Sequence, residues 1–459
     1  MNVNEIVTIL ENNFQQKKSY LNLSLLDSIS SISTDTRKIR KGDAFLALYG
    51  ENFDGHLFIR HAIEKGASVI ILEEEAMVDP IHKISQIVVS NTLEAYQQIA
   101  SWWRNKYKIP IIAITGSVGK TTTKELIAAS LATYGKVHKT YANYNNEIGV
   151  PRTLLELSEH HNFAVIEMGM RNLGEIRLLT KIIKPSIGII TNVGTAHIGR
   201  LGSKEAIAQA KCELLSEMPS DSIAILNHDD ELLIKTASQI WKGKTLTYGL
   251  DQGDVIGKLV NDKTLKVEDM NFPLPLVGRH NAINYLASLA VVKSLRLDWK
   301  MLTKQIKVEI PQGRSQKYSL PGDIVLLDET YNAGLESMKA SLQMLKDTPG
   351  KRHIAVLGAM KELGANSSQF HREVGETAQT LKIDILYILI SDNEAQAIAD
   401  GVQAIADGVQ DIEVNCFLNQ KKLLEQLISE VKDGDRVLFK ASNSVHLKLL
   451  VEQVYQHFM

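Results

Sequence analysis

Short apolar runs alternate with longer amphipathic stretches along most of this chain. Within residues 1–90, apolar runs at 44–48, 67–72 and 86–90 are separated by helical patterns such as the one at 56–66. Short apolar runs bounded by polar turns predict strands, and apolar positions recurring every three to four residues predict helices. The first part of the chain is therefore expected to form a small α/β unit.

The same alternation continues through the rest of the chain. A helical pattern at 91–108 leads into an apolar run, and another helix follows the segment GRHNAINY at 278–285 and ends near residue 297. Alternating strands and helices predict mostly parallel sheets. The strands predicted after residue 90 lie at residues 109–114, 163–168, 186–193, 222–226, 322–329, 353–360, 384–390 and 436–442.

The length of the chain favours several domains. A chain of 459 residues is longer than a single hydrophobic core normally supports. We predict an α/β protein of three domains, at residues 1–90, 91–312 and 313–459, with a hinge at Gln312-Gly313-Arg314.

A seven-residue repeat interrupts the third unit. AIADGVQ at 397–403 is followed at once by the same letters at 404–410. Seven residues are nearly two helical turns, so the insertion hardly rotates the residues after it. We expect it to lengthen an exposed helix or loop and its deletion to leave activity intact; a partner-binding feature is the alternative.

The segment TGSVGKTT at 115–122 has the pattern of a phosphate-binding loop. It joins the apolar run at 109–114 to a helix predicted at 124–134, and such a junction directs backbone N–H groups and a helix N-terminus at polyphosphate. The usual motif has a glycine six residues before the lysine, where this chain has Ile114. An incidental glycine turn is the alternative. The predicted nucleotide-binding residues here are Thr115, Gly116, Ser117, Val118, Gly119, Lys120, Thr121 and Thr122.

Within this loop, two side chains have predicted roles. Lys120 is expected to reach the β- and γ-phosphates, and Thr121 to offer its hydroxyl to Mg²⁺. Glu167, at the end of a predicted central strand, is placed where a nucleotide-bound Mg²⁺ needs an oxygen ligand. His197 follows another strand and is either a metal ligand or an ordinary loop histidine.

Lys211 is the most informative single residue. A helix predicted to open at Ser203 has an apolar stripe through Ile207, Leu214 and Met218, and Lys211 falls on it. A lysine that points inward needs an anion or a changed charge. Either its side chain extends to solvent, or it is a neutral amine that takes up CO₂ and becomes a carbamate, an anion able to bind a second Mg²⁺.

Further polar residues sit at predicted helix starts, hinges and strand ends. Asn281 and Asn284 carry amides suited to a base edge, and Arg314 lies on the hinge. Asp328 and Glu329 end a strand, and the loop after it presents Tyr331 and Asn332.

Composition narrows the function classes. Lys and Arg total 51 and Asp and Glu 53, a net charge of −2, which gives no support to nucleic-acid binding. The two cysteines, Cys212 and Cys416, lack metal-site spacing and suit a reducing compartment. No apolar stretch is long enough for a bilayer, and the N-terminus has no signal-peptide pattern. We therefore expect a cytoplasmic protein that does not insert into membranes.

Taken together, these stretches resemble the Mur ligase family, which adds amino acids or dipeptides to UDP-linked muramic acid. The resemblance covers nearly the whole chain. It is carried by STDTRKIRKGDAFLALYGENFDGHLF (33–58), NYNNEIGVPRTLLEL (143–157), VIEMGMRNLGEI (165–176), ETYNAGLESM (329–338) and VLGAMKELGANSSQFHREVG (356–375). It implies a UDP-binding domain, a central P-loop ATP-binding domain and a Rossmann-like C-terminal domain for the incoming amine.

The resemblance also implies site residues. Lys211 matches the carbamylated lysine of the family, Glu167 and His197 match its ligands for two Mg²⁺ ions, and Asn281 and Arg314 match ATP contacts, to which we add Asp328. The amine site is expected at Tyr331, Asn332, His371 and Lys440. The UDP-substrate residues are expected to be Ser33, Thr34, Asp35, Arg37, Asn52, Asp54, Gly55 and Asn145.

Two segments depart from the family pattern. The loop that usually continues Asn-Pro after Tyr-Asn-Ala reads Gly334-Leu335 here, and a late Lys-Gly-Ser-Arg motif reads Lys440-Ala441-Ser442-Asn443. Both lie in the domain expected to hold the amine.

The C-terminal segments most resemble members that add D-alanyl-D-alanine to a UDP-N-acetylmuramoyl-tripeptide. We expect the same substrates here, a monomer, and a reaction in which ATP phosphorylates a carboxylate and an amine displaces the phosphate. Other readings are a ligase that adds a single amino acid, a folylpolyglutamate synthase-like enzyme, and a P-loop kinase or ATPase.

Overall fold

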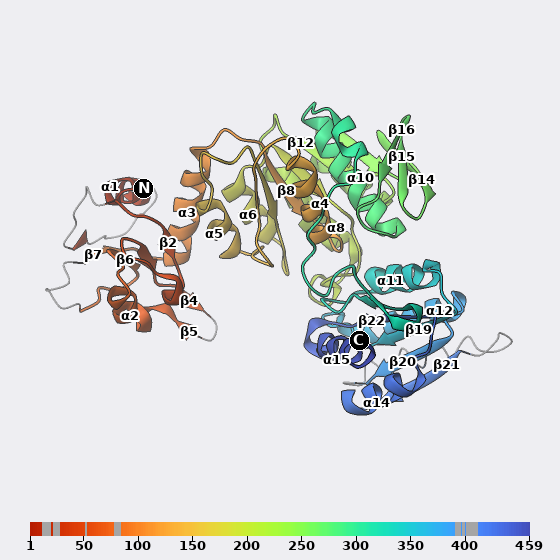
Figure 1. Cartoon of the computed structure of the whole chain (residues 1–459). Helices are drawn as coiled ribbons and strands as arrows, with labels where there is room; N and C mark the ends of the chain where they lie inside the picture. Colours follow the sequence, from red (N-terminus) through yellow and green to blue (C-terminus); the bar gives the residue numbers. More distant parts are fainter. Residues whose placement is uncertain are drawn as a thin grey trace.

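The computed structural model describes residues 1–11, 20–21, 28–50, 53–77, 84–390, 396, 400 and 412–459. Asn52 and the AIADGVQ repeat, apart from Asp400, lie outside the described residues. Three main sheets follow one another along the chain, and Figure 1 shows them as three units, the first at the left, the second at the top and the third below it.

The first unit is built on a five-stranded sheet in the order β1-β7-β6-β3-β2, parallel except for β1. All four residues of β6 are buried, which explains the continuous apolar run. β4 and β5 form a separate antiparallel ladder. The elements are α1 (Val3–Glu11), β1 (Tyr20–Leu21), β2 (Ile32–Ser33), β3 (Ala44–Leu46), β4 (Tyr49–Gly50), β5 (Phe53–Asp54), α2 (Ile59–Glu64), β6 (Val69–Leu72), β7 (Ser85–Val88) and α3 (Thr92–Asn105).

The second unit has a nine-stranded sheet in the order β16-β15-β14-β13-β12-β11-β8-β10-β9, parallel from β9 to β14. Its strands are β8 (Ile111–Thr115), β9 (Val137–Lys139), β10 (Phe163–Glu167), β11 (Ile187–Ile190), β12 (Ile223–Asn227), β13 (Lys244–Gly249), β14 (Val255–Asn261), β15 (Thr264–Val267) and β16 (Met270–Pro273). Its helices are α4 (Lys120–Leu131), α5 (Gly149–Leu155), α6 (Glu175–Ile183), α7 (Ile198–Leu201), α8 (Lys204–Glu217), α9 (Glu231–Ile240) and α10 (Arg279–Ser294).

Helices cover both faces of this sheet, and strand β8 shows why its sequence is apolar throughout. Ile111 and Ala113 belong to the core that includes α6 and α8, whereas Ile112 and Ile114 belong to the core that includes α4 and α10. Successive side chains of a strand point to opposite faces, so a strand covered on both faces has no polar side.

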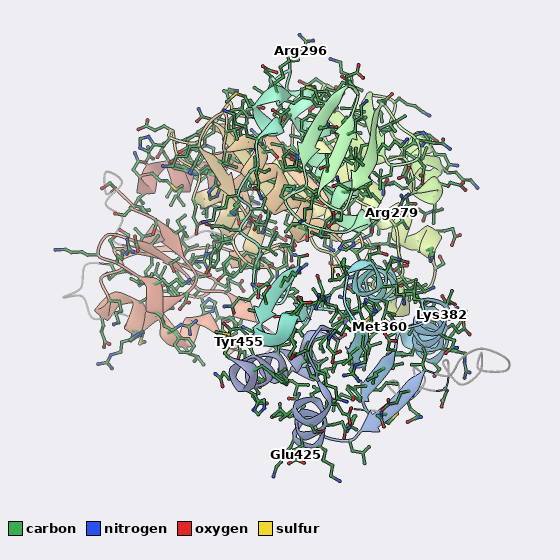
Figure 2. All side chains as sticks on the ribbon, turned by 45° about the vertical axis from the view of Figure 1, so that its right-hand side comes forward. Arg279, Arg296, Met360, Lys382, Glu425 and Tyr455 are labelled. Carbon is green, nitrogen blue, oxygen red and sulfur yellow. The ribbon has the colours of Figure 1, made fainter. Side chains whose placement is uncertain are left out.

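The third unit has a six-stranded sheet in the order β17-β18-β22-β19-β20-β21, in which only β17 is antiparallel. Figure 2 shows Met360 of this unit below Arg279 of the central unit. The elements are β17 (Gln316–Leu320), β18 (Ile324–Asp328), α11 (Leu335–Asp347), β19 (Arg352–Leu357), α12 (Ser367–Thr380), β20 (Ile385–Leu389), β21 (Glu413–Phe417), α14 (Gln420–Glu430), β22 (Asp435–Lys440) and α15 (Leu447–Phe458).

Each strand predicted from an apolar run is present, with ends shifted by a few residues. Among the helices, α4 begins at Lys120 and ends at Leu131 rather than spanning the predicted 124–134. Gly119, at φ 81°, precedes the helix in a left-handed conformation, which lets the chain turn directly from the loop into the helix. The division into domains at residues 90 and 312 stays a prediction. In the described part of the chain, no helix is both long enough and apolar enough to span a bilayer.

Candidate active site

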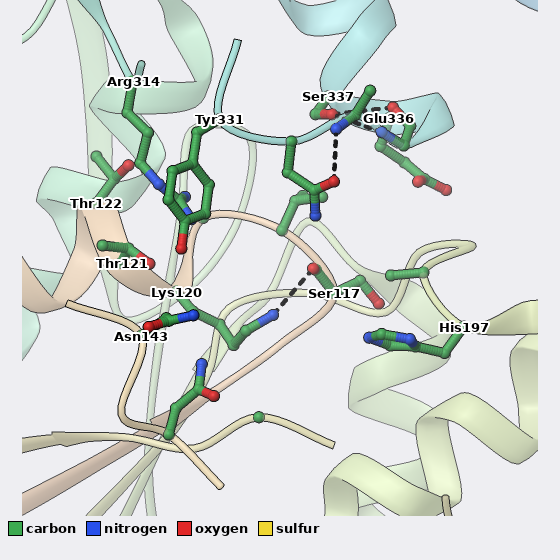
Figure 3. A pocket seen from close by; sticks show the side chains of 18 of the residues that line it. Ser117, Lys120, Thr121, Thr122, Asn143, His197, Arg314, Tyr331, Glu336 and Ser337 are labelled. Carbon is green, nitrogen blue, oxygen red and sulfur yellow. Dashed lines mark hydrogen bonds between the residues drawn. The ribbon is translucent and has the colours of Figure 1, made fainter. Parts of the chain in front are cut away.

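A cleft of about 990 Å³ lies between the central and C-terminal units. Figure 3 shows Lys120 and His197 of the central unit on one side, and Arg314, Tyr331 and Glu336 on the other. The cleft is lined by residues predicted for the nucleotide, metal and amine sites, together with Asn145: Ser117, Val118, Gly119, Lys120, Thr121, Thr122, Asn145, Glu167, His197, Asn281, Arg314, Tyr331, Asn332 and Lys440.

The loop between β8 and α4 requires glycine at its first position. Gly116 has φ 153°, and a Cβ there would lie 1.9 Å from Thr191 Oγ1, a contact no side chain can make. The Thr191 hydroxyl donates to the Val118 carbonyl at 2.7 Å, so the loop is held against the end of β11. Asn192 supports the same point, since its amide donates to the Val118 carbonyl and accepts from the Val118 N–H, each at 3.0 Å.

Lys120 is folded back onto this loop. Its ammonium donates to the Gly116 carbonyl at 2.7 Å and to the Ser117 carbonyl at 3.1 Å, the second of which is drawn in Figure 3. Burial lowers the pKa of Lys120, and the positive charge of Arg314 acts in the same direction, against the opposing effect of Glu167. A phosphate in the cleft would supply a negative charge that favours the protonated form of Lys120.

Glu167 ends β10 with one oxygen bonded and one unpaired. Oε1 accepts from Asn145 Nδ2 at 2.8 Å, whereas the buried Oε2 has no hydrogen-bond partner within the described structure. The nearest cation to Oε2 is the Lys124 ammonium, at 3.7 Å. A buried carboxylate oxygen without a donor, at the edge of a cleft, has the chemistry of a divalent-cation ligand.

Lys124 is a residue that the sequence analysis did not single out. It is fully buried on α4, where its ammonium donates to the Thr140 carbonyl at 2.9 Å and lies 3.1 Å from Glu125 Oε1. Glu125 also pairs with the half-buried Lys139. The only indication in the sequence is that Lys124 lies on the second turn of the helix that follows the glycine loop. Its burial could not be predicted, because Thr140 and Glu167 come from other parts of the chain.

His197 lies at the start of α7 in a left-handed conformation, at φ 65°. Its ring lines the cleft, and Nδ1 lies 2.7 Å from Glu362 Oε2 of the C-terminal unit. Burial lowers the pKa of His197, and the carboxylate of Glu362 opposes that shift. A neutral imidazole with one nitrogen facing a carboxylate can present the other nitrogen to a metal.

Lys211 is buried on α8, as its position on the apolar stripe predicts. Helix α8 begins after Ser203, whose side chain accepts from the Ala206 N–H, and the Lys211 side chain is 1% exposed. Burial sets the pKa of Lys211 well below its usual range, and the charge of Lys120 acts in the same direction. The amine is therefore neutral far more readily than a surface lysine would be. Lys211 is not among the residues that form the wall of the cleft.

The C-terminal unit contributes an arginine, a tyrosine and a lysine to the cleft. The Arg314 guanidinium lies over the Tyr331 ring, 3.8 Å from its centroid. The Lys440 ammonium donates to the Asn332 carbonyl at 3.0 Å and to that of Glu329 at 3.4 Å. Burial lowers the pKa of Lys440 and raises that of Glu329. These groups form a polar wall opposite the phosphate loop.

Asp328 and His371, predicted for the nucleotide and amine sites, do not line the cleft. Asp328 is buried, and its Oδ1 accepts from the Thr330 N–H and hydroxyl at 3.0 and 2.6 Å, so it shapes the turn after β18. His371 is fully buried on α12. Its Nε2 accepts from the Met360 N–H and its Nδ1 donates to the Ser367 carbonyl, both at 2.8 Å. With both ring nitrogens used internally, His371 supports the fold and is not placed to hold an amine substrate.

The predicted UDP-substrate residues fall in two places. Most of them lie on the N-terminal unit, and none of these lines the cleft: Ser33, Thr34, Asp35, Arg37, Asp54 and Gly55. Asn145 is the exception, because its amide lies in the cleft against Glu167. Thr115 and Gly116 are not part of the cleft wall either. Gly116 nevertheless shapes the loop whose following residues line the cleft.

The fold and this cleft match one class of protein, and the chain belongs to the Mur ligase family. Three models of that family match in succession: "Mur ligase family, catalytic domain" at residues 28–104, "Mur ligase middle domain" at 114–292 and "Mur ligase, glutamate ligase domain" at 313–443.

Individual relatives narrow the comparison. The UDP-N-acetylmuramoyl-tripeptide–D-alanyl-D-alanine ligase of Synechocystis is 54% identical over 437 residues, covering 95% of this chain and 94% of that protein. The ligase of the same name from Bacillus subtilis is 33% identical, covering 93% of each chain. Among solved structures, MurF from Acinetobacter baumannii superposes with a TM-score of 0.88 at 28% identity, covering 99% of this chain and 98% of that one. MurF from Thermotoga maritima, in complex with ADP, gives 0.82 at 29% identity, covering 95% and 99%.

Proposed function

We propose that this protein is an ATP-dependent ligase that joins D-alanyl-D-alanine to UDP-N-acetylmuramoyl-tripeptide in peptidoglycan precursor synthesis. The observation that carries the proposal is the cleft itself, in which a phosphate loop and a buried carboxylate face a polar wall from another unit. The 54% identity to a ligase of that name supports the choice of substrates.

ATP is assigned to the phosphate loop. Ser117 to Thr122 line the cleft at the N-terminus of α4, where backbone N–H groups favour a polyphosphate. The related enzyme from Thermotoga maritima was solved with ADP. On this assignment Asn281 and Arg314 contact the nucleotide from α10 and from the start of the C-terminal unit.

The residues present also fit Mg²⁺, of which we propose two ions. Glu167 Oε2 is buried without a donor, and the Thr121 hydroxyl and the His197 ring line the same cleft. When bound, Mg²⁺ neutralises the phosphate charge that builds up during transfer. For Lys211 we propose carbamylation, in which its neutral amine adds CO₂ and releases a proton, so that the buried side chain becomes an anion and a further ligand.

The chemistry proposed for the chain takes place in two steps. A carboxylate oxygen of the tripeptide attacks the γ-phosphorus, the bond from that phosphorus to ADP breaks, and an acyl phosphate forms. The amine of the dipeptide then attacks the acyl carbon and phosphate leaves, while the amine gives up a proton. Lys120 offsets negative charge in the first step, and the wall around Tyr331, Asn332 and Lys440 holds the dipeptide for the second.

Three ligand sites on one chain suit the three proposed domains, so a monomer suffices. The first domain would hold UDP, the central one ATP and the third the amine, and closure would keep water from the acyl phosphate. We also propose a cytoplasmic location, because the reaction consumes ATP and both cysteines are free thiols.

The test is a competition read by product mass. The purified chain is offered ATP, UDP-N-acetylmuramoyl-tripeptide and equal D-Ala-D-Ala, D-Ala, L-Lys and meso-diaminopimelate. We expect only the dipeptide to be incorporated, with ADP release that needs both the carboxylate and the amine. Faster incorporation of a single amino acid would identify a different member of the family. ADP release without any amine would indicate a kinase or ATPase.

A further inference from the structure

The loop that carries His197 contacts the C-terminal unit through a buried threonine. Thr195 is fully buried; its N–H donates to Glu336 Oε1 at 2.9 Å and its hydroxyl to Glu336 Oε2 at 3.0 Å. Glu336 belongs to the first turn of α11, in the C-terminal unit. Both oxygens of one carboxylate are thus used to hold a single residue of the central unit, a two-point contact that fixes orientation as well as distance.

The neighbouring residues are shaped for this contact. A Cβ on Gly194 would lie 2.7 Å from the Glu336 carboxylate carbon, so a larger residue would push that carboxylate out of its present position. Lys204, at the start of α8, lies 3.9 Å from Glu336 Oε1 and adds a weaker attraction. Figure 3 shows Glu336 above His197, on the opposite wall of the cleft but toward the same edge of the view.

A second carboxylate of the C-terminal unit faces the histidine itself. Glu362 Oε2 lies 2.7 Å from His197 Nδ1, close enough for an ion pair although the angles are not those of a hydrogen bond, and the Glu362 carbonyl accepts from the Gly199 N–H at 3.3 Å. The two backbones meet closely here, because a Cβ on Gly199 would lie 2.6 Å from the Gly364 nitrogen. The first turn of α11 and the segment at Glu362–Gly364 therefore both hold residues 195–199 in place.

We propose that Glu336 and Glu362 are positioning residues through which seating of the C-terminal unit sets the His197 ring for metal binding. With Nδ1 turned to Glu362, the remaining nitrogen, Nε2, is left for the cleft, as in the carboxylate–histidine–metal arrangement of many metal sites. This inference rests on the proposed function. Its consequence is that the metal site is complete only when the unit proposed to hold the amine is docked, so phosphate transfer is tied to closure.

The contact between the two units is perturbed most directly by a larger residue at position 199. Gly199→Ala suits helix α7 but places a methyl group against the Gly364 backbone, so the two units cannot seat fully. Thr195→Val removes the hydroxyl donor with almost no change of shape, and Thr195→Ser should restore it. Glu362→Gln removes the charge facing His197. The matched control is Glu373→Gln, which loses an ion pair with Lys339 inside the C-terminal unit, 2.8 Å long.

Two measurements on the full chain decide the matter: the radius of gyration by small-angle X-ray scattering, and Mn²⁺ affinity in the presence of a non-hydrolysable ATP analogue, by electron paramagnetic resonance. Circular dichroism checks that each variant is folded. We expect Gly199→Ala to enlarge the radius and, with Glu362→Gln, to weaken Mn²⁺ binding by about 10- to 100-fold, the usual effect of losing a residue that orients a ligand. Thr195→Val should act in the same direction, whereas Thr195→Ser and Glu373→Gln should behave as wild type.

Unchanged Mn²⁺ affinity in Glu362→Gln and Gly199→Ala would overturn the inference, and so would an equal loss in the Glu373→Gln control. Failure of the proposed function would give a different result, in the wild-type chain itself. If the wild-type chain with the analogue binds no Mn²⁺, the metal assignment itself is wrong, whatever the variants do.

Discussion

Replacing Lys124 by methionine should destabilise the central unit more than any surface charge change. Methionine keeps the length and apolar stem of the side chain but removes the ammonium, which donates to the Thr140 carbonyl at 2.9 Å and lies 3.1 and 3.7 Å from oxygens of Glu125 and Glu167. All of these groups are buried. The change therefore leaves two carboxylates and a carbonyl without their shared cation.

The expected size follows from that burial. Removing one partner of a buried ion pair costs about 3–5 kcal/mol, because an uncompensated charge stays in a medium that solvates it poorly. For a unit of this size, each kcal/mol lowers the melting temperature by about 2–4 °C. We expect a loss on the order of 10 °C in the transition that reports on the central unit, followed by calorimetry and by urea unfolding.

Two further variants make the result interpretable. Lys139→Met removes the other cation paired with Glu125, but the Lys139 side chain is 39% exposed, so it should cost about 1 kcal/mol or less. The double variant Lys124→Met/Glu125→Gln removes one of the stranded charges and should recover part of the loss. If Lys124→Met costs no more than Lys139→Met, the buried network is not what stabilises this part of the fold.

Four other outcomes can be checked directly. Lys120→Ala should reduce turnover by at least about 100-fold, a loss of roughly 3 kcal/mol or more of transition-state stabilisation. Its circular dichroism spectrum should match that of the wild type. A near-normal rate would mean that the catalytic site lies elsewhere. Lys211→Ala should be nearly inactive and partly restored by added short carboxylic acids, whereas full activity of the wild type in CO₂-free buffer would argue against the carbamate. Gly116→Ala should abolish ATP binding measured by calorimetry, with partial recovery when Thr191→Ala removes the hydroxyl 1.9 Å from the new Cβ. His371→Leu should lower the free energy of unfolding by about 1–3 kcal/mol, because it leaves the Met360 N–H unpaired. The KM for the dipeptide should stay unchanged; a raised KM in a variant that is still stable would indicate that His371 does act at the amine site.

Local features of this protein follow from its sequence because neighbouring residues decide them. The run at 109–114 forms a strand because branched apolar residues suit a position buried on both faces, and β8 occupies Ile111–Thr115. Helix α8 begins after Ser203 because a serine side chain can cap the first turn, and the apolar stripe of that helix predicts the burial of Lys211. The phosphate loop is equally local, since it needs only a strand, a glycine turn and a helix in succession.

The tertiary structure alone decides which side chains meet. Glu362 and Glu336 touch the His197 loop although 165 and 141 residues separate the partners, and no local pattern in either segment predicts the other. The same reason explains why two of the predicted site residues lie away from the cleft. His371 and Asp328 carry suitable chemistry, but internal hydrogen bonds turn them away from the cleft. A side chain's direction depends on the hydrogen-bond partners that packing brings to it, and those partners come from distant parts of the chain.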